Sequence, residues 1–183
     1  MRRSLALATF ALAVTALPVV AQPTATLSGS NTFVDWLTVN NIGVGGGLVD
    51  DNTTVYWLKE KEIGGLQSWL IFFDPAATQS VSGSIFFPSA IQALFTSTAD
   101  VTVNSAAYEL TPTVTYVTHP NTGLETNDDA SFAGNVLTFD FSASDPGDHV
   151  RVLTTTVPEP STYGLIAAGL AALAAITRRR RIV

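Results

Sequence analysis

The last 27 residues of this chain have a pattern that does not suit a globular core. They contain Val157-Pro158-Glu159-Pro160, an apolar run from Tyr163 to Ile176, and then four consecutive arginines, Arg178, Arg179, Arg180 and Arg181. Each proline fixes φ, removes a backbone donor and disfavours helix at the preceding residue, which predicts an extended strip at 157–160. A processing enzyme needs an extended strip of this kind. The arginines are expected to stop translocation and to stay on the cytoplasmic side.

The apolar run is predicted to form a transmembrane helix over residues 162–177. The apolar part, residues 163–176, has fourteen residues, which at about 1.5 Å per residue span roughly 21 Å, less than the hydrocarbon core of about 30 Å. By length alone the run also suits a buried core helix. The arginine cluster at 178–181 favours the membrane, because a core helix is not normally followed by four consecutive charges.

These three parts together resemble the PEP-CTERM sorting signal of Gram-negative bacteria. Pro158-Glu159-Pro160 followed by Ser161-Thr162 matches its motif, and the helix and arginine cluster follow in the same order. The resemblance implies recognition by an exosortase, a membrane processing enzyme, in a setting of exopolysaccharide or biofilm production. Segments of the body, such as Ser82–Phe87 and Pro146–Val152, are also similar to a pattern in PEP-CTERM proteins without assigned activity. That second resemblance implies one compact β domain and supplies no catalytic residue.

The amino end is predicted to be a signal peptide covering residues 1–21. Met1-Arg2-Arg3 is a basic segment, residues 5–17 are apolar, and small residues precede a cleavage site between Ala21 and Gln22. An uncleaved membrane helix is the alternative, which the short run, ended by Pro18, disfavours. Signal peptidase, the Sec translocon and, transiently, the inner membrane are the expected partners in export.

Residues 22–156 are then predicted to form one extracellular domain, with the sorting signal at 157–183. This domain retains three basic and fourteen acidic residues, a net charge near −11. Such a charge argues against nucleic acid and anionic membrane surfaces as partners, and leaves neutral polysaccharide and cations open. The chain has no cysteine, which excludes disulfides, thiolate metal sites and a thiol nucleophile.

The domain is predicted to be all-β, an antiparallel sandwich of jelly-roll-like or Greek-key type, because short β-branched and aromatic runs alternate with turn residues. The alternation is clearest at 136–142, where Leu137, Phe139 and Phe141 share one face. Residues 69–73 are continuously apolar, which suggests a strand covered on both faces. Further strands are expected at 32–39, 55–58, 84–87, 100–103, 113–117 and 149–155, and a strand or a helical turn at 91–95. A solvated hairpin end is favoured over a docking patch for the Lys-Glu-Lys-Glu run at 59–62.

Oxygen-rich loops make calcium the one cofactor that the residues suggest, since hard cations take carboxylate and backbone oxygens. The candidate ligands are Asp128, Asp129, Asp145 and Asp148, none of them at EF-hand spacing. An ordinary turn at Asp145-Pro146-Gly147-Asp148 is the competing interpretation. In that interpretation Arg151 is expected to pair with Asp148 or Asp140.

Sugar binding is the functional alternative, with Tyr108 and Tyr116 as candidate exposed rings; the three tryptophans are expected to pack in the core. A hydrolase is a weaker alternative, with Glu125, Asp128 and Asp129 as its first carboxylate candidates. His119 and His149 are expected to be surface residues, and no G-x-S-x-G elbow is present. The favoured hypothesis is a non-enzymatic exported protein, sorted to the cell surface or the exopolysaccharide matrix, with a structural or adhesive role.

Overall fold

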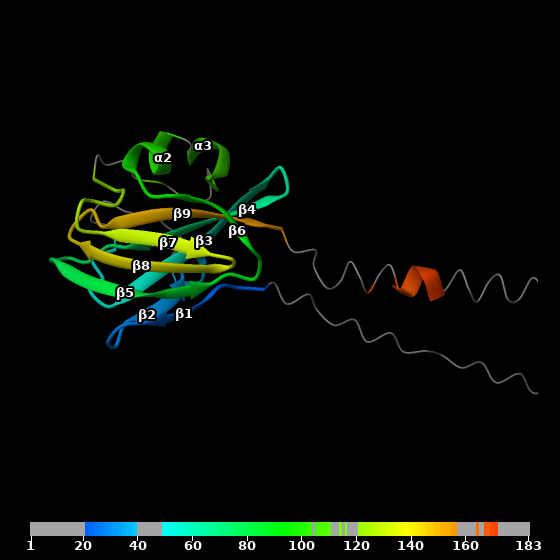
Figure 1. Ribbon diagram of the computed structural model, residues 1–183, viewed down its shortest axis with the longest axis horizontal. Coiled ribbons are helices and arrows are strands. Elements are labelled where there is room, and N and C mark those ends of the chain that lie inside the picture. Colours follow the sequence, from blue (N-terminus) through cyan, green and yellow to red (C-terminus); the bar gives the residue numbers. More distant parts are fainter. Residues whose placement is uncertain are drawn as a thin grey trace, which may run out of the picture. The chain divides into compact units, whose positions relative to one another are not determined.

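The computed structural model describes residues 21–39, 49–103, 105–110, 114, 116, 121–156, 164 and 167–171 (Figure 1). The chain divides into two units, Ala21–Val157 and a second made of residues 1–20 and 158–183. The predicted signal peptide lies outside the described residues up to position 20, as do the motif at 157–160 and the arginine cluster. Of the predicted transmembrane helix, Gly164 and residues 167–171 are described, and they are helical. None of the described helices has the length and hydropathy needed to cross a bilayer.

The unit Ala21–Val157 is built from strands, with three short helices among its described residues. The strands are β1 Thr24–Leu27, β2 Thr32–Asp35, β3 Thr54–Ile63, β4 Leu66–Phe73, β5 Gln79–Phe86, β6 Ile91–Phe95, β7 Asp129–Ala133, β8 Val136–Ala143 and β9 Asp148–Thr155. The helices are α1 Trp36–Val39, α2 Thr98–Val103 and α3 Ser105–Tyr108. Two sheets result: sheet A with the order β1-β5-β8-β7, and sheet B with the order β2-β3-β4-β9-β6. The all-β prediction is confirmed at this level.

One strand pair departs from the antiparallel prediction. Strands β2 and β3 pair in parallel, with Phe33 opposite Val55 and Asp35 opposite Trp57, whereas the other neighbouring strands in the described part of the two sheets pair antiparallel. A parallel pair needs a crossover connection of about a dozen residues or more. Residues 36–53, which include α1, provide that connection, so sheet B is mixed.

The two sheets pack face to face around an inter-sheet core. Leu137, Phe139 and Phe141 of β8 are buried while the residues between them are exposed, as the alternation predicted. They meet Trp57 of β3 and Trp69 of β4 from the opposite sheet in one cluster. The burial of Trp36, Trp57 and Trp69 confirms the prediction that the tryptophans pack in the core.

Sheet B is also covered on its other face. Tyr56, Leu58, Leu70 and Phe72 point away from sheet A and pack with Trp36 of α1, Val101 of α2 and Val114. Figure 1 shows α2 and α3 above the sheet that contains β9. We call the layer formed by α1, α2 and α3 on this face of sheet B the cover. Its presence explains why β4 is almost continuously buried, and the prediction of a doubly covered strand is confirmed.

One predicted strand, 100–103, is helical instead, and the predicted strand 32–39 is a strand only as far as Asp35. Residues 100–103 belong to α2, because Ser97 accepts a hydrogen bond from the backbone N–H of Asp100 (3.1 Å) and donates to its carboxylate (2.6 Å). This is an N-terminal cap, which decides for helix against the β-branched composition. Residues 36–39 belong to α1, where the Asp35 carboxylate accepts from the N–H of Leu37 (3.0 Å). The strands β1 and β7 were not predicted, and most of the predicted strand 113–117 lies outside the described residues.

Candidate functional site

Both predicted processing points lie next to the ends of the β unit in the sequence. Ala21 and Gln22 are exposed and precede β1 by a few residues. Strand β9 ends at Thr155, and the N–H of Thr156 donates to the carbonyl of Gly65 (3.1 Å). The segment Val157–Pro160, which lies outside the described residues, follows directly. Cleavage at these two points would therefore leave every described strand intact.

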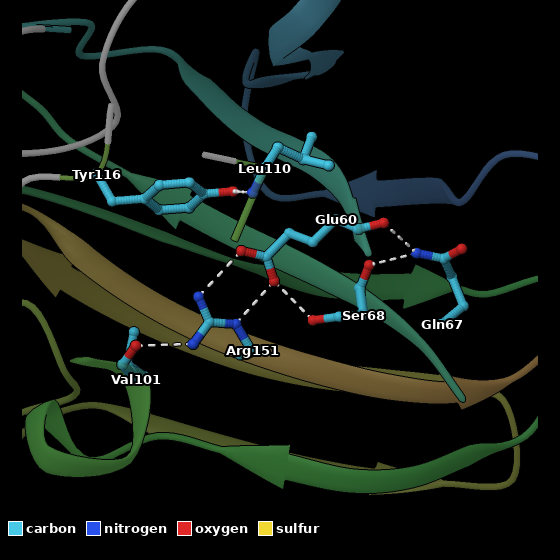
Figure 2. Close-up of polar contacts among 7 residues, drawn as sticks. All are labelled: Glu60, Gln67, Ser68, Val101, Leu110, Tyr116 and Arg151. Carbon is cyan, nitrogen blue, oxygen red and sulfur yellow. Dashed lines mark hydrogen bonds and ion pairs between the residues drawn. The ribbon is translucent and has the colours of Figure 1, made fainter. Parts of the chain in front are cut away.

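The most developed polar site of the β unit is a buried ion pair between sheet B and the cover. Arg151 of β9 donates from Nε to Oε2 of Glu60 (2.7 Å) and from Nη2 to Oε1 (3.0 Å). The two side chains are 1 % and 0 % exposed. Figure 2 shows this two-point contact, a geometry that suits the planar guanidinium. The pairing of Arg151 with Asp148 or Asp140 expected from the sequence is wrong, because Glu60 is its partner.

Further hydrogen bonds complete the network around the pair (Figure 2). Ser68 donates from Oγ to Oε2 of Glu60 (2.6 Å), and Arg151 donates from Nη1 to the carbonyl of Val101 in α2 (2.7 Å). Gln67 donates from Nε2 to the backbone carbonyls of Glu60 (2.7 Å) and Ser68 (2.8 Å). The Val101 contact joins the charged pair to the cover, so the network connects two layers that are distant in sequence.

The Lys-Glu-Lys-Glu run at 59–62 is therefore more than a solvated hairpin end. It lies within β3, and the turn occurs later, at Gly64 and Gly65, both of which have positive φ. The register of β3 against β4 shifts between Lys59 and Glu62. Glu60 lies in that irregular stretch with its side chain in the interior, whereas Glu62 is exposed.

The two tyrosines predicted as sugar ligands both lie beside this network and are half-buried. The guanidinium of Arg151 lies over the ring of Tyr108, 5.7 Å from its centroid, and Phe95 contacts the same ring. The Tyr116 hydroxyl accepts a hydrogen bond from the N–H of Leu110 (3.2 Å). Burial and the nearby Glu60 carboxylate raise the pKa of Tyr116 well above its ordinary value. Both rings thus contribute to holding the cover on sheet B.

The four candidate calcium ligands occupy different environments. Asp145 and Asp129 are exposed, and Asp129 lies opposite Asp140 on the outer face of sheet A. Asp128 is half-buried: its Oδ1 accepts from the N–H of Ser142 (2.7 Å) and its Oδ2 from the N–H of Glu125 (2.9 Å). Asp148 is 3 % exposed. Glu125, the first hydrolase candidate, is exposed beside Asp128.

Two neighbouring titratable groups at the start of β9 have strongly shifted pKa values. Burial, together with the charges of Asp128 and Glu125, raises the pKa of Asp148 to about 7. Burial, together with Arg151, lowers the pKa of His149 to about 4. His149 is 3 % exposed and its ring packs on Phe72, so the prediction of a surface histidine is wrong here. His119 lies outside the described residues.

One comparison with known proteins identifies a feature of the chain. The family model described as the PEP-CTERM protein-sorting motif matches residues 156–181. The chain therefore carries a PEP-CTERM motif, which implies export and processing by an exosortase. No curated protein and no solved structure gives a significant match.

Proposed function

We propose that this protein is delivered by an exosortase-type system to the cell surface or the exopolysaccharide matrix, where its β domain has a structural or adhesive role. The match of the sorting motif to residues 156–181 carries the proposal. The β unit supports it: Ala21–Val157 forms a compact unit of its own, flanked by the two predicted processing points. Processing would then release a folded domain.

Replacement of both motif prolines tests the sorting step. In the variant Pro158→Ala/Pro160→Ala we expect the chain to keep its tail and to remain in the membrane fraction, because the two prolines that favour an extended segment are lost. The matched control is Pro112→Ala/Pro120→Ala, two prolines outside the tail, which should be processed like the parent. Blotting of cell fractions from the native host provides the measurement. Normal processing and release of the motif variant would overturn the proposal.

A carbohydrate-binding module is the second candidate, and the outer face of sheet A favours it. On this face the strand register aligns one row of hydroxyl residues across all four strands, Thr26, Ser84, Thr138 and Ser131. Phe86 lies two residues after Ser84 on β5, and therefore on the same face, and its side chain is 44 % exposed. Hydroxyls that bond sugar hydroxyls, beside a ring that packs on a sugar face, suit an uncharged polysaccharide. The net charge near −11 of residues 22–156 disfavours an acidic one.

Affinity electrophoresis tests this candidate. The protein should be retarded in gels that contain a neutral β-glucan and should migrate normally in gels that contain alginate, an acidic polymer. Phe86→Ala should reduce the retardation, whereas Thr78→Ala, in an exposed loop, should not. Equal migration in all gels would overturn the candidate. Release of reducing ends from the glucan would instead indicate a hydrolase.

A further inference from the structure

Strand β9 ends in a backbone that is hydrogen-bonded on both of its edges. The N–H of Thr155 donates to the carbonyl of Ala90 (3.1 Å), and the carbonyl of Thr155 accepts from the hydroxyl of Ser89. On the other edge, the N–H of Thr156 donates to the carbonyl of Gly65 (3.1 Å). We call Ser89, Ala90 and Gly65 the clamp, because they hold the end of β9 from two sides.

The residue before the clamped pair is anchored through its side chain as well. Thr154 is 1 % exposed, and its hydroxyl accepts a hydrogen bond from Nε1 of the buried Trp69 (2.9 Å). Its register partners are Gln67 on β4 and Ile91 on β6, so both edges of the strand are still covered here. Withdrawal of residues 154–156 from the sheet would therefore break several hydrogen bonds at once.

The segment that carries Ser89 is itself held in place as it passes from sheet A to sheet B. The N–H of Phe87 donates to the carbonyl of Asn135 (2.9 Å), and Nδ2 of Asn135 donates to the carbonyl of Phe87 (2.8 Å). The N–H of Ile91 donates to the carbonyl of Gly134 (2.8 Å). The turn between β7 and β8 thus fixes both ends of the segment that reaches the end of β9.

The other part of the clamp lies in the tight turn between β3 and β4. Gly64 and Gly65 have φ angles of 60° and 80°, the positive values that a two-residue type I′ turn requires. Strand β4 begins directly after this turn, at Leu66, and strand β6 begins at Ile91. Both neighbours of β9 therefore reach their own ends at the level where β9 ends.

The clamp occupies backbone groups that a processing enzyme would need. A protein that binds an extended peptide by strand addition pairs with the N–H and C=O groups of that peptide. The N–H and C=O of Thr155 and the N–H of Thr156 are already paired within the domain. An enzyme can take hold of these two residues only after the end of the sheet has opened locally.

We propose that the clamp sets the upstream limit of processing. It withholds residues 154–156 from the processing enzyme and confines cleavage to residues 157–162, the stretch between the sheet and the apolar run. This inference rests on the proposed sorting function and adds the position of the cut. Ser89 and Gly65 are then positioning residues, which act through β9 and do not touch the bond that is cut.

Limited proteolysis tests the clamp by itself. The full-length chain is purified in detergent from a strain without the processing enzyme, treated with subtilisin as a protease of broad specificity, and analysed by mass spectrometry. We expect bonds within residues 157–162 to be cut about tenfold or more faster than bonds within 154–156, because the latter require local opening of the sheet. Equal rates for the two segments in the parent would overturn the proposal.

Removal of one clamp hydrogen bond should move the limit. Ser89→Ala should raise the rate of cutting within residues 154–156 about fivefold, the effect of one lost hydrogen bond on local opening, and should leave cuts elsewhere in the domain unchanged. Ser89→Thr keeps the hydroxyl and should behave like the parent. Ser80→Ala is the matched control, since Ser80 is exposed on β5. Equal rates in Ser89→Ala and Ser80→Ala would overturn the proposal.

A second pair of variants acts on the segment that carries Ser89 and keeps the test decisive if Ser89→Ala does not fold. Asn135→Ala removes the bond to the carbonyl of Phe87 (2.8 Å) and should also speed cutting within residues 154–156. Asn31→Ala removes a bond of the same kind and length, to the carbonyl of Ser28, and should not. The same rate in both asparagine variants would count against the clamp.

The native host separates this inference from the sorting proposal. The released parent should end at Thr156 or beyond, and Ser89→Ala should add products that end at Thr154 or Thr155. A parent that is never processed would contradict the sorting function, and the subtilisin result would still decide the clamp. A processed parent that ends at Thr154 or Thr155 would overturn the clamp while leaving the sorting function in place.

Discussion

The two faces of sheet B are stabilised in different ways. The face toward sheet A packs in an apolar core with residues such as Trp57, Ile71 and Val152, which are 5 %, 0 % and 0 % exposed. The face toward the cover is equally buried but has a charged pair, Glu60 and Arg151, among its apolar residues. Apolar burial has no directional requirement, whereas a buried pair stabilises only with the correct partners in place. We therefore expect the first core to tolerate apolar substitutions, and the second to specify which segment covers the sheet.

The largest loss in the free energy of unfolding should come from a substitution that opens a cavity in the inter-sheet core. Phe141 of β8 is 0 % exposed, and Phe141→Ala should lower the free energy of unfolding by about 3–5 kcal/mol. Thr138→Ala, on the exposed face of the same strand, should change it by no more than about 0.5 kcal/mol. Urea denaturation gives both values. A loss below about 1 kcal/mol for Phe141→Ala would contradict the packing described for this core.

Removal of the Glu60 charge tests whether the ion pair stabilises the face of sheet B toward the cover. Glu60→Gln leaves the buried Arg151 guanidinium without a counter-charge and should lower the free energy of unfolding by about 3 kcal/mol. Glu62→Gln is the matched control, because Glu62 lies on the same strand and is exposed. The double variant Glu60→Met/Arg151→Met should lose less than Glu60→Gln, since no uncompensated charge remains. Additive losses in the double variant would show that the two charges are independent.

A neutral hydrogen bond in the inter-sheet core should contribute less to the free energy of unfolding than the charged pair does. The Trp69 indole donates from Nε1 to the hydroxyl of Thr154 (2.9 Å), and both residues are buried. Thr154→Val keeps the shape and leaves the indole N–H unpaired, which should lower the free energy of unfolding by about 1–2 kcal/mol. Thr155→Val, at the exposed neighbouring position, should have little effect. Equal effects from the two variants would argue against a role for this bond.

The smallest predicted effect depends on pH. Tyr56 donates from its hydroxyl to Oδ2 of Asp51 (2.9 Å). Burial acts to raise the pKa of Asp51, but hydrogen bonds from Thr53, Tyr56 and Thr54 hold that pKa below its usual value of 3.8. Burial and Asp51 raise the pKa of Tyr56 to about 12 from 10.0. Tyr56→Phe should lower the free energy of unfolding by about 0.5–1 kcal/mol at neutral pH.

The sign of the pH dependence follows from these shifts. The stabilisation through Asp51 is present above its unfolded-state pKa and is lost as the pH falls through the lower folded-state value. The stabilisation through Tyr56 is present below pH 10.0 and is lost as the pH rises through about 12. The difference between parent and Tyr56→Phe should therefore shrink in strong acid and in strong base. A difference that is constant from acid to base would rule out this hydrogen bond as its source.

The same contrast explains what was predictable from the sequence. The inter-sheet core follows from alternation that is local to one strand, as in Leu137, Phe139 and Phe141, and it was predicted correctly. The pair of Glu60 with Arg151 joins residues 91 positions apart, and a register shift in β3 accompanies it. No local pattern indicates that Glu60, rather than Glu62, faces the interior. The one available signal was general: a lone arginine in so acidic a domain needs a carboxylate, but Asp148 and Asp140 were the wrong choices.

The helices and the burial of Asp148 and His149 were missed for similar reasons. Helix α2 has a β-branched composition, and its capping by Ser97 outweighs that preference. The burial of Asp148 and His149 depends on the cover and on the loop at 121–128, which come from other parts of the chain. The sequence groups Asp128 and Asp148 with Asp145 and Asp129, whereas in the structure the first two are half-buried and buried and the other two are exposed. The sorting motif was predictable because it is a contiguous segment of the sequence and needs no tertiary contact to be recognised.

Intact-mass measurement of the mature protein, after fractionation of its native host, tests the central claim most directly. The claim is that export and sorting deliver the strands of the compact β unit free of the two segments that flank them. We predict a chain outside the cell that begins at Gln22 and ends within or just before the segment 157–160. A chain that retains the apolar run and Arg178–Arg181 and remains in the inner membrane would contradict the claim, because the tail would then be a permanent anchor.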